Sequence, residues 1–112
     1  MPDLYPESTP KLQARRKALA PEPLGAFHEF SRRVFADGAL STQVKQLIAV
    51  AVAHATQCPY CIRGHTEAAV KTGATDEQIM EAIWVAAEMR AGAAYAHSTI
   101  ALNTLETIRS AG

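Results

Sequence analysis

Cys58 and Cys61 are the two cysteines of this 112-residue sequence, and they lie three positions apart. His65 follows four positions after Cys61, so on a helix the three side chains would share one face. One thiolate of such a pair can attack an electrophilic oxygen or a disulfide, and the other thiol can resolve the sulfenic acid or mixed disulfide that results. A neighbouring histidine can accept the thiol proton. The spacing therefore favours a redox centre in which His65 activates Cys61.

A zinc site is the alternative that the same stretch allows. His54, Cys58, Cys61 and His65 are four side chains of the types that bind zinc. His54, however, would have to fold back from the preceding helix, and a chain with 48% hydrophobic residues has little need of a structural metal. A third interpretation makes the cysteines two core residues beside an incidental histidine. We expect redox chemistry without a metal or cofactor, and we keep a zinc-stabilised interaction module as the alternative.

The helix that carries the motif is expected to begin at Pro59, because proline is favoured in the first turn of a helix. It should continue through Val70 and end at Gly73, since glycine often follows the last helical residue. The cysteines then lie at its first turn, where unpaired backbone N–H groups and the positive end of the helix dipole stabilise a thiolate. Gly64, inside this helix, indicates a close approach by another helix.

A central helix is expected before the motif. Ser41 is a candidate N-cap, and the early polar positions of this helix include Gln46. The apolar residues that follow Ser41 recur at helical spacing: Val44, Leu47, Ile48, Ala51, Val52 and Ala55. This stripe is broad enough to be buried on more than one side, which places the helix in the middle of the fold.

The rest of the chain completes an all-α prediction of about six helices. Helices are expected over residues 11–19 and 23–36, and residues 1–10, with three prolines, should form an extended arm. A capping box at Thr75 and Gln78 starts a fifth helix, on which Trp84 should lie in the core or in an interface. After Ala91 and Gly92 a sixth helix is expected, with small and apolar residues on one side: Ala94, Ala101, Leu105 and Ile108.

The composition indicates one helical domain over residues 1–112, because alanine supplies much of the hydrophobic fraction and aromatic residues make up only 6%. Eleven basic and 11 acidic residues balance, so no net field attracts nucleic acid or an anionic membrane. There is no secretion signal and no apolar run long enough to span a bilayer, so we expect a cytoplasmic protein. The apolar surface of the last helix and Trp84 exceeds what a short monomer can bury, which predicts a homo-oligomer.

Three stretches of the sequence together resemble the carboxymuconolactone decarboxylase superfamily: residues 40–53, the C-P-Y-C-I-x-x-H motif at residues 58–65, and residues 73–79. Within it the chain is most similar to the alkylhydroperoxidase AhpD-like proteins, over residues 20–105. The resemblance implies an all-α fold that forms homotrimers or homohexamers, with thiol-dependent peroxidase or disulfide-exchange activity. The decarboxylase branch generally lacks the cysteine pair, so a decarboxylase-like enzyme without peroxidase turnover is the less favoured alternative.

The resemblance also implies a role for each residue of the site. Cys61 attacks the hydroperoxide, Cys58 resolves the product to a Cys58–Cys61 disulfide, and His65 belongs to the proton relay. An external dithiol or a thiol protein then reduces the pair. Gln46 stands where the family relay has a glutamate, and Tyr60 where the best-known peroxidases have a histidine. A glutamine can orient a histidine or a water molecule, but it cannot accept the proton.

Overall fold

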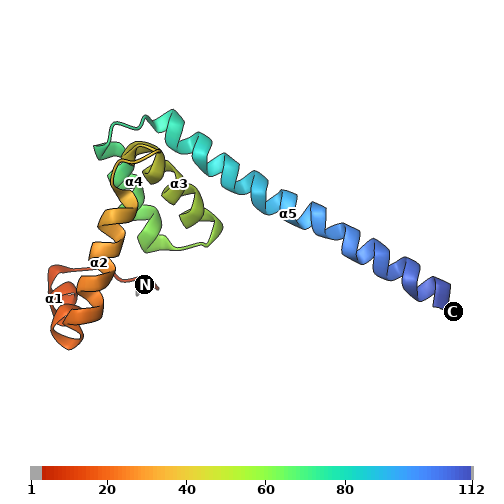
Figure 1. Cartoon of the computed structure of the whole chain (residues 1–112), viewed down its shortest axis with the longest axis horizontal. Helices are drawn as coiled ribbons and strands as arrows, with labels where there is room; N and C mark the ends of the chain where they lie inside the picture. Colours follow the sequence, from red (N-terminus) through yellow and green to blue (C-terminus); the bar gives the residue numbers. More distant parts are fainter. Residues whose placement is uncertain (1–3, 112) are drawn as a thin grey trace.

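The computed structural model describes residues 4–111, which form five α-helices (Figure 1). Their bounds are α1 Pro10–Leu19, α2 Pro21–Phe35, α3 Thr42–Ala55, α4 Pro59–Lys71 and α5 Asp76–Ala111. No strand occurs among these residues, which confirms the predicted all-α class. A short turn brings α4 back alongside α3, and α5 crosses α3 before it leaves the rest of the molecule.

The prediction of six helices is wrong because the last two are one helix. α5 continues without interruption through Ala91 and Gly92, where the sequence predicts a break. A single glycine inside a helix costs only about 1 kcal/mol relative to alanine. The neighbours of Gly92 are alanines, which are the strongest helix formers, so the helix tolerates it. With 36 residues, α5 is about 54 Å long.

Local capping sequences set the starts of two inner helices, as predicted. The Ser41 hydroxyl accepts a hydrogen bond from the N–H of Val44 (3.2 Å). The N–H of Thr75 donates to Oε1 of Gln78 (2.9 Å), and the N–H of Gln78 donates to Oγ1 of Thr75 (3.1 Å). In both places a side chain satisfies an amide that the first turn leaves without a helical partner. The caps fix where α3 and α5 begin, and therefore where their apolar faces point.

The buried core lies between α3, α4 and the first half of α5. Val50 of α3 and Ala69 of α4 have no exposed surface, and Ala74, just after α4, is 8% exposed. Three partly buried residues pack against this cluster: Leu47, Ile79 and Ile83. The small side chains let the helices approach closely, and the Gln43 side chain of α3 donates to the carbonyl of Thr72 after α4 (2.8 Å). α3 is thus the central helix, as predicted.

Residues 4–9 form a non-helical segment that returns to α4. The Tyr60 hydroxyl donates to the carbonyl of Pro6 (2.8 Å), and the Tyr60 ring meets Tyr5 edge-on with centroids 6.1 Å apart. The predicted arm is therefore confirmed for residues 4–9, while Pro10 already belongs to α1, with Thr9 as its N-cap. The first part of the predicted arm, residues 1–3, lies outside the described residues.

Two residues predicted to lie in close contacts are open to solvent in this chain. No atom of another element lies within 4 Å of the place where a Cβ would sit on Gly64, so the predicted close helix crossing is wrong. Trp84 is 66% exposed on α5, so it is not part of the core. Its alternative place in an interface stays a prediction.

The second half of α5 makes the molecule elongated (Figure 1), with dimensions of 63 × 35 × 34 Å. Near the middle of the helix, the Arg90 guanidinium donates to the carbonyl of Ala55 at the end of α3 (2.9 Å). Every residue from 93 to 111 is exposed. Despite the length of α5, no helix within residues 4–111 is both long and apolar enough to cross a membrane.

Candidate redox site

The turn between α3 and α4 positions the two cysteines. Residues 56–58 are all that separates Ala55, the last residue of α3, from Pro59. Gln57 adopts the left-handed conformation, with φ of 56°, which lets the chain reverse within so short a turn. The N–H of Cys58 then donates to the carbonyl of Ala53 (3.0 Å). The first turn of α4 is therefore fixed against the last turn of α3.

Cys58 and Cys61 form a disulfide in this structure, with their Cα atoms 5.3 Å apart. This separation lies within the usual range for disulfides, so the first turn of α4 brings the two sulfurs together without any rearrangement of the backbone. Cys58 is also the N-cap of α4, and its sulfur accepts a hydrogen bond from the N–H of Cys61 (3.3 Å). As the sequence predicts for this turn, the helix N-terminus is placed to stabilise negative charge on a sulfur.

His65, one turn further along α4, is held by two neighbours. Its Nδ1 lies 2.8 Å from Oε1 of Gln46 on α3, and Gln46 is only 8% exposed, which shields this hydrogen bond from water. On another side the ring of Phe35 stacks on the imidazole, with centroids 5.2 Å apart and an interplanar angle of 26°. Since the amide oxygen is the acceptor in this assignment, Nδ1 carries the proton and Nε2 is left as a base. Gln46 therefore orients His65, as the sequence predicts for a glutamine.

Phe35 is the last residue of α2, and the loop after it is tied to α3. The Thr42 hydroxyl donates to the carbonyl of Phe35 (2.8 Å), and the N–H of Thr42 donates to the Asp37 carboxylate (2.7 Å). The hydrogen bond from this N–H is the largest of the effects that lower the pKa of Asp37 below its usual value. The Lys45 ammonium donates to the carbonyl of Ala36 (2.6 Å). These bonds hold the end of α2 against α3 and so position the Phe35 ring over His65.

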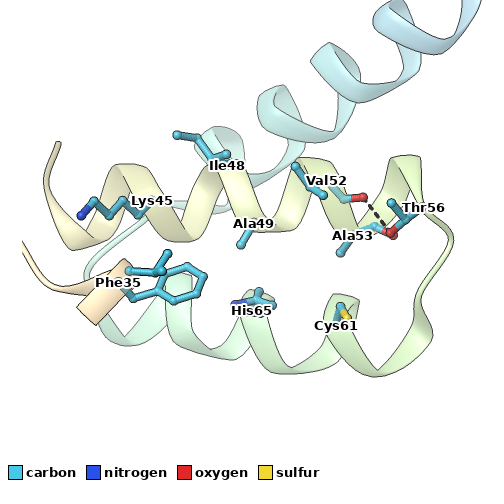
Figure 2. A pocket seen from close by; sticks show the side chains of 10 residues that line it. Phe35, Lys45, Ile48, Ala49, Val52, Ala53, Thr56, Cys61 and His65 are labelled. Atoms are coloured by element: carbon cyan, nitrogen blue, oxygen red, sulfur yellow. Dashed lines mark hydrogen bonds between the residues drawn. The ribbon is translucent and has the colours of Figure 1, made fainter. Parts of the chain in front are cut away.

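An open apolar cavity of about 410 Å³ lies beside Cys61 and His65 (Figure 2). In this view Phe35, His65 and Cys61 follow one another along the same side of α4, and Ala49 and Ala53 of α3 lie above them. The lining comes from α2, α3, α4 and the turn after α3: Val34, Phe35, Lys45, Ile48, Ala49, Val52, Ala53, Thr56, Cys61 and His65. The sulfur of Cys61 and the imidazole of His65 thus border a cavity that suits a small apolar molecule.

Tyr60, between the two cysteines, contacts the N-terminal arm. Tyr60 lines a second open cavity of about 650 Å³ together with Cys61 and His65. Its hydroxyl, however, donates to the carbonyl of Pro6. In the structure Tyr60 therefore holds the N-terminal arm beside the cysteine pair. Its predicted role in catalysis stays untested.

The four residues of the zinc alternative do not assemble into a metal site. Nδ1 of His54 lies 2.7 Å from the carbonyl of Val50 on its own helix, which holds the ring along α3. Residues 4–111 contain no group of three or more histidine, cysteine, aspartate or glutamate side chains placed to bind a metal ion. His54 therefore does not fold back toward the two cysteines and His65, as a zinc site would require.

The structure brings four of the predicted residues together and adds one that the sequence did not indicate. Cys58, Cys61, His65 and Gln46 gather where α3 meets α4. Phe35, by contrast, lies in the helix predicted over residues 23–36 and was not predicted to belong to the site. Its contact with His65 spans 30 positions of the chain, so no local pattern reveals it.

A family model for the carboxymuconolactone decarboxylase family matches residues 21–104 of this chain. The match includes α2, α3, α4 and most of α5, and therefore every residue of the site described above. The chain belongs to the carboxymuconolactone decarboxylase family, which confirms the predicted resemblance.

Similar proteins come from several organisms. An uncharacterized protein of the cox locus of Paracoccus denitrificans is 67% identical over 86 residues, which are 77% of this chain and 78% of the relative. The apo structure of a carboxymuconolactone decarboxylase family protein from Legionella pneumophila is 37% identical, with a TM-score of 0.68 over 70% of each chain. A family member from Thermotoga maritima, described with a possible involvement in the antioxidative response, is 28% identical, with a TM-score of 0.59 over 80% of this chain and 92% of its own.

Proposed function

We propose that this protein is an AhpD-like, thiol-dependent antioxidant oxidoreductase that reduces organic hydroperoxides, or disulfides, through Cys58 and Cys61. The observation that carries the proposal is the disulfide at the start of α4, which lies one helical turn from the hydrogen bond between His65 and Gln46. The description of the Thermotoga maritima relative, with its possible involvement in the antioxidative response, supports the same chemistry.

The reaction begins with the reduced pair. Nε2 of His65 accepts the proton of the Cys61 thiol, and the thiolate attacks the terminal oxygen of the hydroperoxide. A sulfur–oxygen bond forms, the oxygen–oxygen bond breaks, and the alkoxide leaves as an alcohol with the proton from His65. The Cys58 thiol then attacks the sulfenic acid on Cys61, which forms the disulfide and releases water. One hydroperoxide becomes one alcohol and one water while two thiols become one disulfide.

The two sulfurs have different surroundings, and this difference supports the division of roles. Cys61 lines the apolar cavity together with His65, which is where a hydroperoxide would meet a base. The sulfur of Cys58 is engaged by the first turn of α4 through the N–H of Cys61. A sulfur held there is well placed to close the disulfide without moving far. Cys61 is therefore the attacking residue, and Cys58 is the resolving one.

Gln46 limits how far the proton travels. Its amide can hold Nδ1 of His65, but it has no basic site that could take the proton onward. The proton from Cys61 therefore stays on the imidazole until the leaving alkoxide accepts it. The relay is short and consists of His65 alone, with Gln46 and Phe35 as positioning residues.

The disulfide must be reduced by an external thiol before the next turnover. A dithiol, or a protein with two thiols, attacks one sulfur of the pair to form a mixed disulfide. Its second thiol then releases the reduced protein, so the reductant leaves as a disulfide. The cavity beside Cys61 is lined mainly by apolar side chains, which favours an organic hydroperoxide as the oxidising substrate.

Counting thiols tests the proposal directly, because the chain has two cysteines and both belong to the pair. Metal-free, fully reduced protein is mixed under argon with one equivalent of an organic hydroperoxide, quenched by alkylation and weighed by mass spectrometry. Both thiols should disappear together, and a dithiol should restore them. A sample without hydroperoxide serves as the control, and Cys61→Ser should retain its Cys58 thiol. Survival of both thiols in the unmodified protein would overturn the proposal.

A further inference from the structure

The second cavity at the cysteine pair brings together more of the predicted site residues than the first. It is the cavity of about 650 Å³ that Tyr60 lines, and we call it the α2–α4 cavity because most of its lining comes from these two helices. Cys61 and His65 line both cavities, whereas the lining of the α2–α4 cavity also includes Gln46 and Tyr60. Its volume lies within the range of about 300–1,000 Å³ that is typical of small-molecule sites.

One wall of the α2–α4 cavity is an aromatic side of α2. Phe27, Phe30 and Val34 line it and follow one another at intervals of three and four residues, so their side chains lie on one side of the helix. Phe27 and Phe30 are 63% and 64% exposed, although a phenylalanine gains stability from burial. From Phe27 to Phe35, whose ring stacks on His65, the wall is about 12 Å long. It therefore suits a hydrocarbon chain or ring.

A glycine keeps the α4 side of the cavity open. Gly64 belongs to the lining, three residues after Cys61 and directly before His65. Apart from its chain neighbours and the backbone of its own helix, nothing among the described residues comes within 4 Å of the place where its Cβ would sit. A glycine at such a place lets a ligand approach the backbone closely. The open space therefore adjoins the residues that would carry out the chemistry.

The rim of the α2–α4 cavity carries a surplus positive charge. Arg32 lines the cavity, and its Nε and Nη2 donate to the Glu29 carboxylate (2.9 and 2.6 Å). Nε of Arg33 donates to the same carboxylate (2.9 Å). The bonds from Arg32 and then Arg33 lower the pKa of Glu29, so its carboxyl is ionised at neutral pH. One negative charge thus faces two positive charges, and Nη1 of Arg32 is not part of its pair with Glu29.

The charge in the first cavity, by contrast, is balanced. Lys45 lines this cavity at the end opposite Cys61 (Figure 2), and its ammonium donates to the carbonyl of Ala36. The same ammonium interacts with the carboxylate of Asp37, whose negative charge offsets it. Of these two cavities, the α2–α4 cavity is therefore the one whose charge suits an anion.

We propose that the α2–α4 cavity binds the body of a fatty-acid hydroperoxide, with the hydrocarbon chain against the phenylalanines of α2 and the carboxylate at Arg32. The hydroperoxide group then meets Cys61 and His65 at the inner end of the cavity. The inference rests on the proposed function for its reaction and names the substrate class. The two thiols supply the electrons, so the hydroperoxy acid becomes a hydroxy acid and water while the Cys58–Cys61 disulfide forms.

Binding of a hydroxy acid tests the site without turnover. The oxidised protein is titrated in a calorimeter with ω-hydroxydecanoic acid and with its methyl ester, which has the same chain and no charge. The acid should bind more tightly by a factor of roughly 1.5–5, as for an ion pair with an exposed arginine, and this difference should shrink at high salt. Equal affinities would overturn the proposal. Absence of binding by both, as expected if a protein surface covers the phenylalanines, would also overturn it.

A pair of arginine variants shows whether the charge acts from the rim. In Arg32→Gln the acid should lose its advantage over the ester. Arg63→Gln is the control, because Arg63 is an exposed cation of α4 between Cys61 and Gly64 but outside the lining of the α2–α4 cavity. The control should keep the advantage of the acid. An equal loss in both variants would assign the preference to the overall charge of the chain and overturn the role of Arg32.

A pair of glycine variants shows whether the ligand occupies the cavity. Gly64→Leu places a side chain in the open space and should abolish binding of both probes. Gly25→Leu adds the same side chain at another open position of a helix, outside this lining, and should leave binding intact. Leucine favours helix over glycine, so both variants should fold. Equal binding by the two variants would overturn the site.

Oxidation of the reduced protein completes the test. Gly64→Leu, but not Gly25→Leu, should lower the ratio of the rate with linoleic acid hydroperoxide to the rate with hydrogen peroxide. An unchanged ratio would overturn the substrate class. If the hydroxy acid binds as expected but both thiols survive every hydroperoxide, the proposed function fails and the binding site stands. If the thiols are oxidised but acid and ester bind equally, this inference fails and the proposed function stands.

Discussion

Replacing Gln46 by leucine should slow the oxidation of Cys61 by a factor of roughly 2–13. Gln46 is buried, and its contribution to the site is one hydrogen bond of 2.8 Å to Nδ1 of His65. A neutral hydrogen bond of this kind contributes a net ~0.5–1.5 kcal/mol, and 1.36 kcal/mol corresponds to a factor of ten in rate. If the bond acts by holding the imidazole in its reactive orientation, its full loss therefore reduces the rate by a factor of roughly 2–13.

A double-mutant cycle shows whether Gln46 acts through His65. General acid–base catalysis contributes ~100-fold or more, so His65→Ala should slow the reaction by at least that factor. If Gln46 only positions His65, the variant that carries both changes should be no slower than His65→Ala alone. The rates come from rapid quenching of reduced protein in excess organic hydroperoxide, followed by mass spectrometric counting of alkylated thiols.

Gln43→Leu is the matched control for this cycle. Gln43 lies one turn before Gln46 on α3, and its side chain also makes one hydrogen bond of 2.8 Å to another segment, but to the carbonyl of Thr72. Both single variants should lose a similar ~1 kcal/mol of unfolding free energy, whereas only Gln46→Leu should slow thiol oxidation. A double variant that is slower than His65→Ala by the same factor that Gln46→Leu shows on its own would refute the reasoning, because Gln46 would then act independently of the imidazole.

Three further results are expected. Cys58→Ser should leave a sulfenic acid on Cys61 that dimedone traps, because no thiol remains to resolve it, and an unreactive Cys61 would count against its attacking role. Folding lowers the pKa of Asp37, mainly through the hydrogen bond that the N–H of Thr42 donates to it. The ionised Asp37 therefore stabilises the fold fully above the unfolded-state pKa of about 4, and this contribution disappears as the pH falls through the lower folded-state pKa. In urea titrations, the unfolding free energy of Asp37→Asn should therefore fall less between about pH 5 and pH 2 than that of the unmodified protein. An equal decrease in the two proteins would contradict this. Gly73→Ala should lower the unfolding free energy by about 1 kcal/mol or more, because Gly73 has φ of 93°, a conformation that a residue with a Cβ adopts only with strain. An alanine variant that is as stable as the unmodified protein, or more stable, would contradict this.

Features with a local cause were predictable from the sequence. Ser41, Pro59 and the Thr75 capping box begin helices because each satisfies or removes an unpaired amide within four residues along the chain. The all-α class and the central place of α3 follow from the spacing of apolar residues. The proximity of Gln46 to His65 was expected from the family resemblance alone, in which Gln46 occupies the relay position.

The features that escaped prediction depend on distant parts of the chain or on small energy differences. Phe35 reaches His65 only because the loop after α2 is tied to Thr42. Gly92 and its alanine neighbours are ambiguous, since about 1 kcal/mol separates a glycine that ends a helix from one that is tolerated inside it. Gln57 adopts a left-handed conformation that is typical of glycine or asparagine, so its residue type gives no warning of the turn.

The sulfur of Cys58 caps α4 and also closes the disulfide, so one atom serves both folding and chemistry. The two cysteines should therefore differ in how they tolerate replacement over evolution. At position 58 a serine or an aspartate would still cap the helix, and a lineage that had lost the reaction could keep the fold with either residue. Position 61 has no such capping task, so it is free to drift to any small helix-forming residue once the reaction is lost. Capping residues at position 58 beside a varied position 61 would mark relatives that have kept this fold and abandoned thiol chemistry.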